Sequence, residues 1–467
     1  MKGDEVNEDF QSKFLTDAEK MKLKMDKVSP SLCLAKWKQV SLHLQTGRNN
    51  SCYHPPLHKI SIEDIAKEPS ALHNTFQKKS IQGQMLTGAR PSECSYCWAM
   101  EDAGNLSDRH YRSGERWASE SFNDIVDDPF KNHIPSYVEV NFNNACNLAC
   151  SYCSPQFSSS WMREVKEHGG YDLTKTTHND PTYFVGSRRP IPHSEYNPYV
   201  EAFWKWWPDL YPELKHFRMT GGEPLMDKNT YKVFDYVLEH PKPDLHLNVT
   251  SNFSVEEKLW VKYLDKVKQI CQPGNVEHFM QYVSVDTWGH QAEYLRHGLD
   301  FDLLWKRVNQ FLTEVPNYSS ITFIITMSNL SIVELEMLMT GILGLRKKHS
   351  ITFQRVWFDT PVLRSPDFLS MQVLPRRYAS LLEDTKLFMQ ASIETEERRF
   401  KGFKDYEIQR LQRDIDWMKE GTRNTDQHMA DFFKFFDEAD SRHGTSFIET
   451  FPELKTFWEE CFYHATK

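Results

Sequence analysis

Short β-rich segments alternate with amphipathic helical segments from residue 137 onward, and this rhythm limits the fold more than any other feature. Six strands are expected at 137–142, 216–220, 245–250, 281–286, 321–327 and 351–358. The segments between them carry apolar residues at helical spacing, as in "DKNTYKVFDYVLEH" and "FDLLWKRVNQFLTEV". Repeated strand–helix units predict an α/β fold with a parallel sheet.

One interval breaks this rhythm. Residues 154–215 form a long insertion between the first and second expected strands. It contains a Pro- and Arg-rich loop with Arg188 and Arg189, followed by the aromatic helix "YVEAFWKWWPDL". Four tryptophans lie in the insertion, namely Trp161, Trp204, Trp206 and Trp207. Tryptophan and arginine are common anchors at interfaces, so the insertion is expected either to hold a substrate or to pack onto the sheet.

Three cysteines directly follow the first expected strand, in "NNACNLACSYCS". Cys146, Cys150 and Cys153 have CxxxCxxC spacing, and functional residues of parallel α/β barrels gather where strands end. Three thiolates do not complete a tetrahedral zinc site, but they can hold three irons of a cubane cluster and leave the fourth iron open. The alternative is a zinc site with a fourth ligand from elsewhere.

Polar and glycine residues mark the ends of the later expected strands. "TGGEP" follows the second strand, "TSN" the third and "DTWG" the fourth. The glycines allow the backbone to approach a ligand closely and to present carbonyl oxygens. Taken alone, "GGEP" is more typical of an ordinary Gly-Gly turn, and only its combination with the three cysteines favours a cofactor site.

These residues resemble the radical S-adenosylmethionine (SAM) superfamily, over about residues 135–360. The resemblance rests on CxxxCx(aromatic)C with Tyr152 as the aromatic, on "GGEP" and on the spacing of the later strand ends. It implies a partial (β/α)6 TIM-like barrel in which a 4Fe-4S cluster on Cys146, Cys150 and Cys153 binds SAM. By position, the cofactor contacts would be Tyr152, Gly221, Gly222, Glu223, Pro224, Ser251, Asn252, Ser284, Asp286 and Arg296. Side chains that act on the substrate are not identified.

A second group of cysteines lies upstream. Cys33 and Cys52 bracket an expected strand, glycine turn and strand, and Cys94 and Cys97 form a CxxC pair. Four cysteines make a closed site, suited to zinc or to a fully ligated iron–sulfur cluster. The pattern looks like the twitch or SPASM auxiliary-cluster modules of radical SAM enzymes. Such modules commonly follow the barrel, but a phage and bacterial group has them first, with segments like "CSYCWAME" and "SDR" here.

The expected organisation therefore has four parts. They are an N-terminal extension (1–30), a twitch-like module (31–134), the radical SAM core (135–360) and a C-terminal helical extension (361–467). Cys271 and Cys461, which belong to neither cysteine group, are expected to be buried thiols.

The resemblance implies an enzyme that cleaves SAM reductively and abstracts hydrogen from a substrate, with flavodoxin or ferredoxin as electron donor. A peptide or protein side chain is the expected substrate. The alternatives are a small molecule such as a sugar or nucleotide, or a non-catalytic iron–sulfur or zinc scaffold.

Composition and charge indicate which partners and which cellular compartment to expect. The net charge of −9 over 467 residues gives no overall basic face for nucleic acid, and no apolar run is long enough to cross a bilayer. The first residues lack the apolar region of a signal peptide, so a cytoplasmic protein is expected. In a reducing compartment an odd number of cysteines, here nine, favours metal ligation or catalysis over disulfides.

Overall fold

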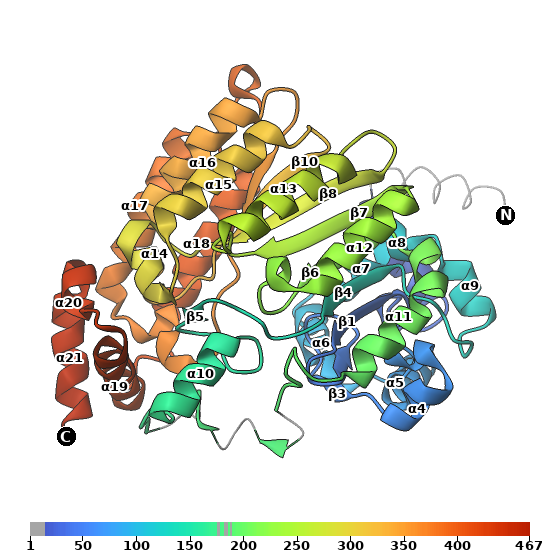
Figure 1. Ribbon diagram of the computed structural model, residues 1–467, viewed down its shortest axis with the longest axis horizontal. Helices are drawn as coiled ribbons and strands as arrows, with labels where there is room; N and C mark the ends of the chain where they lie inside the picture. The colour runs from blue at the N-terminus through green and yellow to red at the C-terminus, as the bar shows by residue number, and fades with distance from the viewer. Residues whose placement is uncertain (1–14, 175–177, 182–184, 187–188) are drawn as a thin grey trace. The chain divides into compact units, whose positions relative to one another are not determined.

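A nine-stranded sheet organises the computed structural model, which describes residues 15–174, 178–181, 185–186 and 189–467 (Figure 1). The strand order is β11-β10-β8-β7-β6-β4-β1-β2-β3. The pairs β1–β4, β8–β10 and β10–β11 are parallel, whereas β1–β2 and β2–β3 are antiparallel. The α/β class is therefore confirmed. Closure into a six-stranded barrel is not confirmed and stays a prediction.

The chain divides into two compact units. The first comprises residues 1–142, 191–219 and 244–246, and the second comprises 143–190, 220–243 and 247–467. The first unit holds the strands β1 (Gln39–His43), β2 (Arg48–Asn50), β3 (His58–Lys59), β4 (Tyr137–Asn141) and β6 (His216–Thr220). Its helices are α2 (Asp17–Asp26), α3 (Ala35–Lys38), α4 (Ile62–Lys67), α5 (Phe76–Leu86), α6 (Ser95–Asp102), α7 (Asp108–Gly114), α8 (Arg116–Ser119), α9 (Phe122–Asp127) and α11 (Pro198–Leu210).

The second unit holds the rest of the described elements, apart from β7 (Lys242–Ser251), which contributes residues to both units. Its strands are β5 (Ala149–Cys150), β8 (Val276–Ser284), β9 (Arg296–His297), β10 (Ser319–Ile324) and β11 (Val356–Asp359). Its helices are α10 (Ser159–His168), α12 (Lys228–Glu239), α13 (Glu257–Ile270), α14 (Gly289–Leu295), α15 (Phe301–Glu314), α16 (Leu335–His349), α17 (Ala379–Ala391), α18 (Asp405–Glu420), α19 (Asp426–His443), α20 (Phe447–Thr450) and α21 (Lys455–Ala465).

Helix signals in the sequence produce the expected helices of the second unit. Asp300 caps α15 by accepting a hydrogen bond from the Leu303 amide at 2.8 Å. Helix α15 packs on the sheet, where its Trp305 stacks on Phe323 of β10 with ring centroids 5.7 Å apart. Figure 1 shows α13, α15 and α16 running beside β8 and β10. One face of the parallel strands is thus covered by the amphipathic helices that connect them.

The N-terminal hairpin belongs to the main sheet. Strands β1 and β2 do form, joined at a turn where Gly47 has φ +62°, a conformation that favours glycine. However, β1 also pairs in parallel with β4, with Val40 opposite Val138. The hairpin therefore extends the main sheet, and residues on both faces of β1, from Gln39 to Leu42, are buried there.

Three expected strands have other limits in the structure. β8 spans Val276–Ser284 where 281–286 was expected, because Phe279 continues upstream the alternation of buried residues seen at Gln281 and Val283. β10 spans Ser319–Ile324 where 321–327 was expected. β11 is confined to Val356–Asp359, where 351–358 was expected. Strand limits are the least certain part of a sequence-based assignment, since pairing partners decide them.

None of the described helices has both the length and the apolar character that crossing a membrane requires.

Asp414 provides a test of packing between α18 and the end of β11. Its carboxyl is buried and accepts a hydrogen bond from the Thr360 hydroxyl at 3.2 Å, and burial raises its pKa to about 7. Because the folded chain holds this proton more tightly than the unfolded chain, stability should fall as pH rises from about 4 to about 7, by at most about 4 kcal/mol. Asp414→Asn should remove this contribution. Urea unfolding measures this at pH 5 and pH 8. The free energy of unfolding of Asp414→Asn relative to the wild type should be higher at pH 8 than at pH 5, whereas that of the exposed control Asp416→Asn should not change with pH.

Candidate functional site

The three cysteines that follow β4 line one cavity in the second unit. Cys146 and Cys150 are buried, and Cys153 is half-buried. The cavity has a volume of about 180 Å³. The other residues that line it are Leu148, Tyr152, Phe157, Gly221, Gly222, Glu223, Thr250, Ser251, Asn252, Ser284, Arg296, Ile324 and Thr326. Eight of the ten residues expected to contact the cofactor are therefore brought together here, all but Pro224 and Asp286.

The start of α10 holds the cysteine loop in shape. The Ser158 hydroxyl donates to the Leu148 carbonyl at 2.6 Å, and the Trp161 indole N–H donates to the Cys150 carbonyl at 2.9 Å. Ser159 accepts from the Cys146 amide and donates to its carbonyl, both at 3.1 Å. These supporting residues were not predicted. The serine run before Trp161 was their only signal, since serine is typical of a helix start.

The glycine turn after β6 packs directly against the cysteine loop. A Cβ atom on Gly222 would lie 2.3 Å from the Ala145 carbonyl oxygen, a distance that real Cβ contacts do not show. Gly221 has φ +111°, which also favours glycine. The Glu223 amide donates to the same Ala145 oxygen at 2.6 Å. The two glycines are thus required for the close approach of two loops.

Glu223 connects this turn to the loop after β7. Its carboxylate accepts hydrogen bonds from the Asn252 amide at 2.8 Å and from the Leu225 amide at 3.0 Å. Burial raises the pKa of the Glu223 carboxyl to about 7, although both amides favour the charged form. Pro224 begins a short 3₁₀ turn (Pro224–Met226) and does not line the cavity.

Arg296 and Asp286 form a buried ion pair at the cavity wall. The Arg296 guanidinium donates to both Asp286 oxygens, at 2.8 and 3.0 Å. Asp286 also accepts from the Tyr152 hydroxyl at 2.8 Å and lies behind Arg296, not among the lining residues. One nitrogen of Arg296 remains 3.6 Å from the Cys150 sulfur. Arg296 therefore presents positive charge to a thiol, with its orientation fixed by Asp286.

Burial controls the protonation of these thiols. It raises the pKa of Cys146 and Cys150, and it raises that of Cys153 to about 12. Arg296 opposes this effect at Cys150. Metal binding requires thiolates, which burial disfavours here. The positive charge of a bound metal group would stabilise them. Three cysteines line an open cavity together with the glycine turn, and this donor set fits a cluster that leaves one iron free.

The four upstream cysteines also converge, within the first unit. Cys33, Cys52, Cys94 and Cys97 all line a cavity of about 30 Å³. Burial raises the pKa of Cys94 and Cys97 to about 12 in each case. Across the described part of the chain, no three His, Cys, Asp or Glu side chains are grouped so as to hold a single metal ion. In an iron–sulfur cubane each thiolate binds its own iron, so the four sulfurs need not meet at one point.

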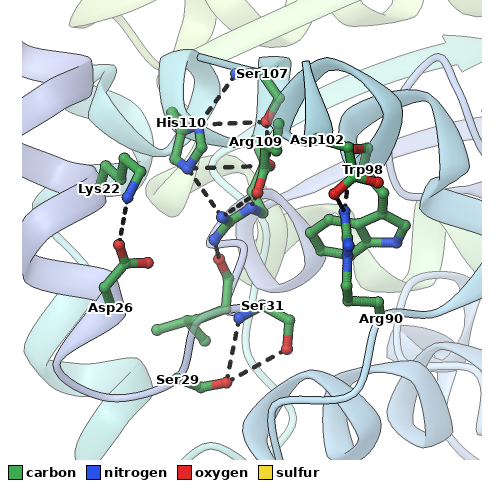
Figure 2. A network of polar contacts seen from close by, with 12 residues as sticks. Lys22, Asp26, Ser29, Ser31, Arg90, Trp98, Asp102, Ser107, Arg109 and His110 are labelled. Atoms are coloured by element: carbon green, nitrogen blue, oxygen red, sulfur yellow. Dashed lines mark hydrogen bonds and ion pairs between the residues drawn. The ribbon is translucent and has the colours of Figure 1, made fainter. Parts of the chain in front are cut away.

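The segments "CSYCWAME" and "SDR" are linked by a polar network that Figure 2 shows around Arg109. Arg109 donates to both Glu101 oxygens, at 3.0 and 2.8 Å, and Ser107 donates to Glu101 at 2.6 Å. Arg109 also donates to the Leu32 carbonyl, next to Cys33, at 2.7 Å. The network joins α6, which carries Cys97, to α7 and to the segment that carries Cys33.

Residues outside both cavities have packing roles. Cys271 and Cys461 are fully buried and line neither cavity, as expected. Trp161, Trp206 and Trp207 are at most 2% exposed, and Trp207 packs on Phe217 with ring centroids 5.1 Å apart. These tryptophans therefore pack the insertion instead of presenting anchors. Arg189 is exposed, and Arg188 lies outside the described residues.

Gly222→Ala tests the contact between the two loops. Since its Cβ would collide with the Ala145 carbonyl oxygen, we expect a loss of about 1–3 kcal/mol in the free energy of unfolding, as for other overpacked sites. Gly344→Ala is the matched control, because no atom lies within 4 Å of its added Cβ and alanine favours the helix α16. Urea unfolding measures both. Equal stability of the two variants would contradict the proposed contact.

Comparison with models of protein families and with curated proteins finds no match for this chain.

Proposed function

We propose that the protein is a radical SAM enzyme, with its cluster on Cys146, Cys150 and Cys153. The observation that carries this proposal is that three cysteines, two of them buried, and the Gly221–Glu223 turn line one cavity of about 180 Å³. A scaffold that merely held metal would need the cysteines alone. Gly222 is needed for packing against Ala145 in either case, so it does not distinguish an enzyme from a scaffold. The polar residues Ser251, Asn252 and Ser284, which also line the cavity, favour the binding of a polar cofactor.

A cluster bound here would supply one electron to SAM, whose cleavage yields methionine and a 5'-deoxyadenosyl radical that abstracts hydrogen from substrate. The chain positions and shields this chemistry. The Gly221–Glu223 backbone and the polar residues after β7 and β8 would bind and orient SAM. Arg296, fixed by Asp286, keeps positive charge beside Cys150, and Leu148, Phe157 and Ile324 exclude water from part of the wall.

The four-cysteine site would hold a second cluster or a structural zinc ion. Four thiolates complete the coordination of either group, but a zinc ion would need the four sulfurs to meet at one point, and no such group is present among the described residues. A peptide or protein side chain stays the predicted substrate, and a small molecule stays the alternative. Flavodoxin or ferredoxin stays the predicted electron donor.

A cysteine variant tests the activity. Anaerobically reconstituted protein, given dithionite and SAM, should release 5'-deoxyadenosine, and replacement of Cys146, Cys150 and Cys153 by Ala should abolish it, because the cluster loses every protein ligand. The control replaces Cys271 and Cys461, buried thiols that line neither cavity, and should retain the activity. Liquid chromatography quantifies the product. Undiminished product from the triple variant would refute the assignment.

Metal counting tests the second site. The reconstituted chain should hold about eight irons if both sites carry cubanes, and about four irons with zinc if the upstream site is structural. In the triple Cys→Ala chain only the upstream site remains, so Mössbauer spectra and metal analysis report it alone. Absence of both metals from that chain would rule out a metal site at Cys33, Cys52, Cys94 and Cys97.

A further inference from the structure

A third cavity, of about 340 Å³, lies in the second unit and is larger than either cavity that cysteines line. Its lining residues are Leu343, Lys347, Ser392, Arg398 and Lys401. Lys347 belongs to the last turn of α16, whereas Ser392, Arg398 and Lys401 lie in the segment that joins α17 to α18. Three cations from two separate segments of the chain therefore line one cavity.

None of these three cations forms an ion pair with a carboxylate of the described residues. Two carboxylates of the neighbouring chain are paired with other cations. Glu407 pairs with Arg346 at 2.7 Å, and Glu394 pairs with Lys404 at 3.1 Å. Like charges that line one cavity repel one another, and a bound anion would relieve this repulsion.

The loop that carries two of the cations is closed at its base. The Phe403 amide donates to the Ser392 carbonyl at 3.0 Å, and the Glu394 amide donates to the Phe403 carbonyl at 2.7 Å. The buried Arg346 donates to the Gly402 carbonyl at 2.9 Å. A Cβ atom on Gly402 would lie 2.5 Å from the Glu394 nitrogen, so this close approach requires glycine. The loop is thus held in shape without a ligand.

A strained residue lies between the two cations of this loop. Phe400 has φ +65°, which residues other than glycine rarely adopt, and its amide donates to the Glu394 carboxylate at 2.9 Å. Such a conformation persists only where its surroundings impose it, and it is common at sites that clamp a ligand. The bend separates Arg398 from Lys401, and both side chains line the cavity.

A phosphate group matches this set of donors. Arginine can bind phosphate oxygens in a bidentate manner, lysine adds a point charge, and the Ser392 hydroxyl can donate a hydrogen bond. None of the lining residues is aromatic, so the cavity offers no surface for stacking of a nucleic-acid base. Glu396 and Glu397 of the same loop are exposed and would repel a long polyanion. A compact anion therefore fits better than nucleic acid.

We propose that Lys347, Arg398 and Lys401 bind a phosphate group, either as free phosphate or as part of a small phosphorylated molecule. Both ligands present the same chemistry to the cavity. The cavity shares no lining residue with the candidate SAM site, so this binding is independent of the proposed function.

The experiment compares three lining variants with two matched controls in the full chain. The lining variants are Lys347→Gln, Arg398→Gln and Lys401→Gln. The controls are Lys348→Gln and Arg399→Gln, which remove the same charge from exposed residues next to Lys347 and Arg398. Neither control residue lines the cavity. Thermal unfolding checks that each variant folds like the wild type.

Isothermal titration calorimetry then measures the binding of inorganic phosphate and of glycerol 3-phosphate at about 0.15 M salt, where weak long-range attraction is screened. The wild type should bind at least one of them. Each lining variant should bind about tenfold more weakly, because it loses a charge-assisted hydrogen bond. The two controls should bind like the wild type.

The two ligands identify the source of the phosphate group. Tighter binding of glycerol 3-phosphate supports a phosphorylated molecule, and binding of inorganic phosphate that is equal or tighter supports the free ion. Two results would overturn the proposal: no binding of either ligand by the wild type, or a loss of affinity in the controls equal to that in the lining variants. The second result would indicate attraction to a basic surface without a defined site.

Discussion

The contact between Gly222 and the Ala145 carbonyl oxygen is the constraint on which the candidate SAM site depends. It sets the distance between the cysteine loop and the glycine turn, with the Glu223 amide bonded to the same oxygen. Glu223 then holds the loop after β7 through the Asn252 amide. Three loops from three strand ends are therefore joined, two of them through a backbone hydrogen bond and the third through the buried Glu223 carboxylate. A cavity bounded by such loops keeps its shape without a ligand.

A buried cation lies at each of the two cavities that cysteines line. Buried thiols resist ionisation, and thiolates bound to metal carry excess negative charge. At the first site Arg296 faces Cys150 and is oriented by Asp286. At the second site Lys36 lines the cavity and is paired with Glu93. In each case a carboxylate holds a cation at the wall of a cavity that cysteines line.

The insertion and the C-terminal helices support the first site from outside. Trp161 of α10 holds the Cys150 carbonyl and packs on Phe435 of α19, with ring centroids 6.5 Å apart. Arg442 at the end of α19 donates to the Gly169 carbonyl at 3.2 Å. Figure 1 shows α10 next to α19. The sequence left open whether the tryptophans of the insertion bind a substrate or pack; Trp161 packs between the cysteine loop and α19.

Sequence alone determined the α/β class, the approximate positions of six strands and the membership of both cysteine groups, because hydrophobic periodicity and cysteine spacing are local. It also placed most residues of the first cavity at strand ends, where parallel strands bring them together. Only the tertiary structure decided that β1 joins β4, that Arg296 turns toward Asp286 and that Trp161 is buried, since each depends on a partner distant in the chain. Lys36 illustrates the same limit. Nothing in the local sequence distinguishes it from a surface lysine, and only folding buries it at the wall of the cavity that the four upstream cysteines line.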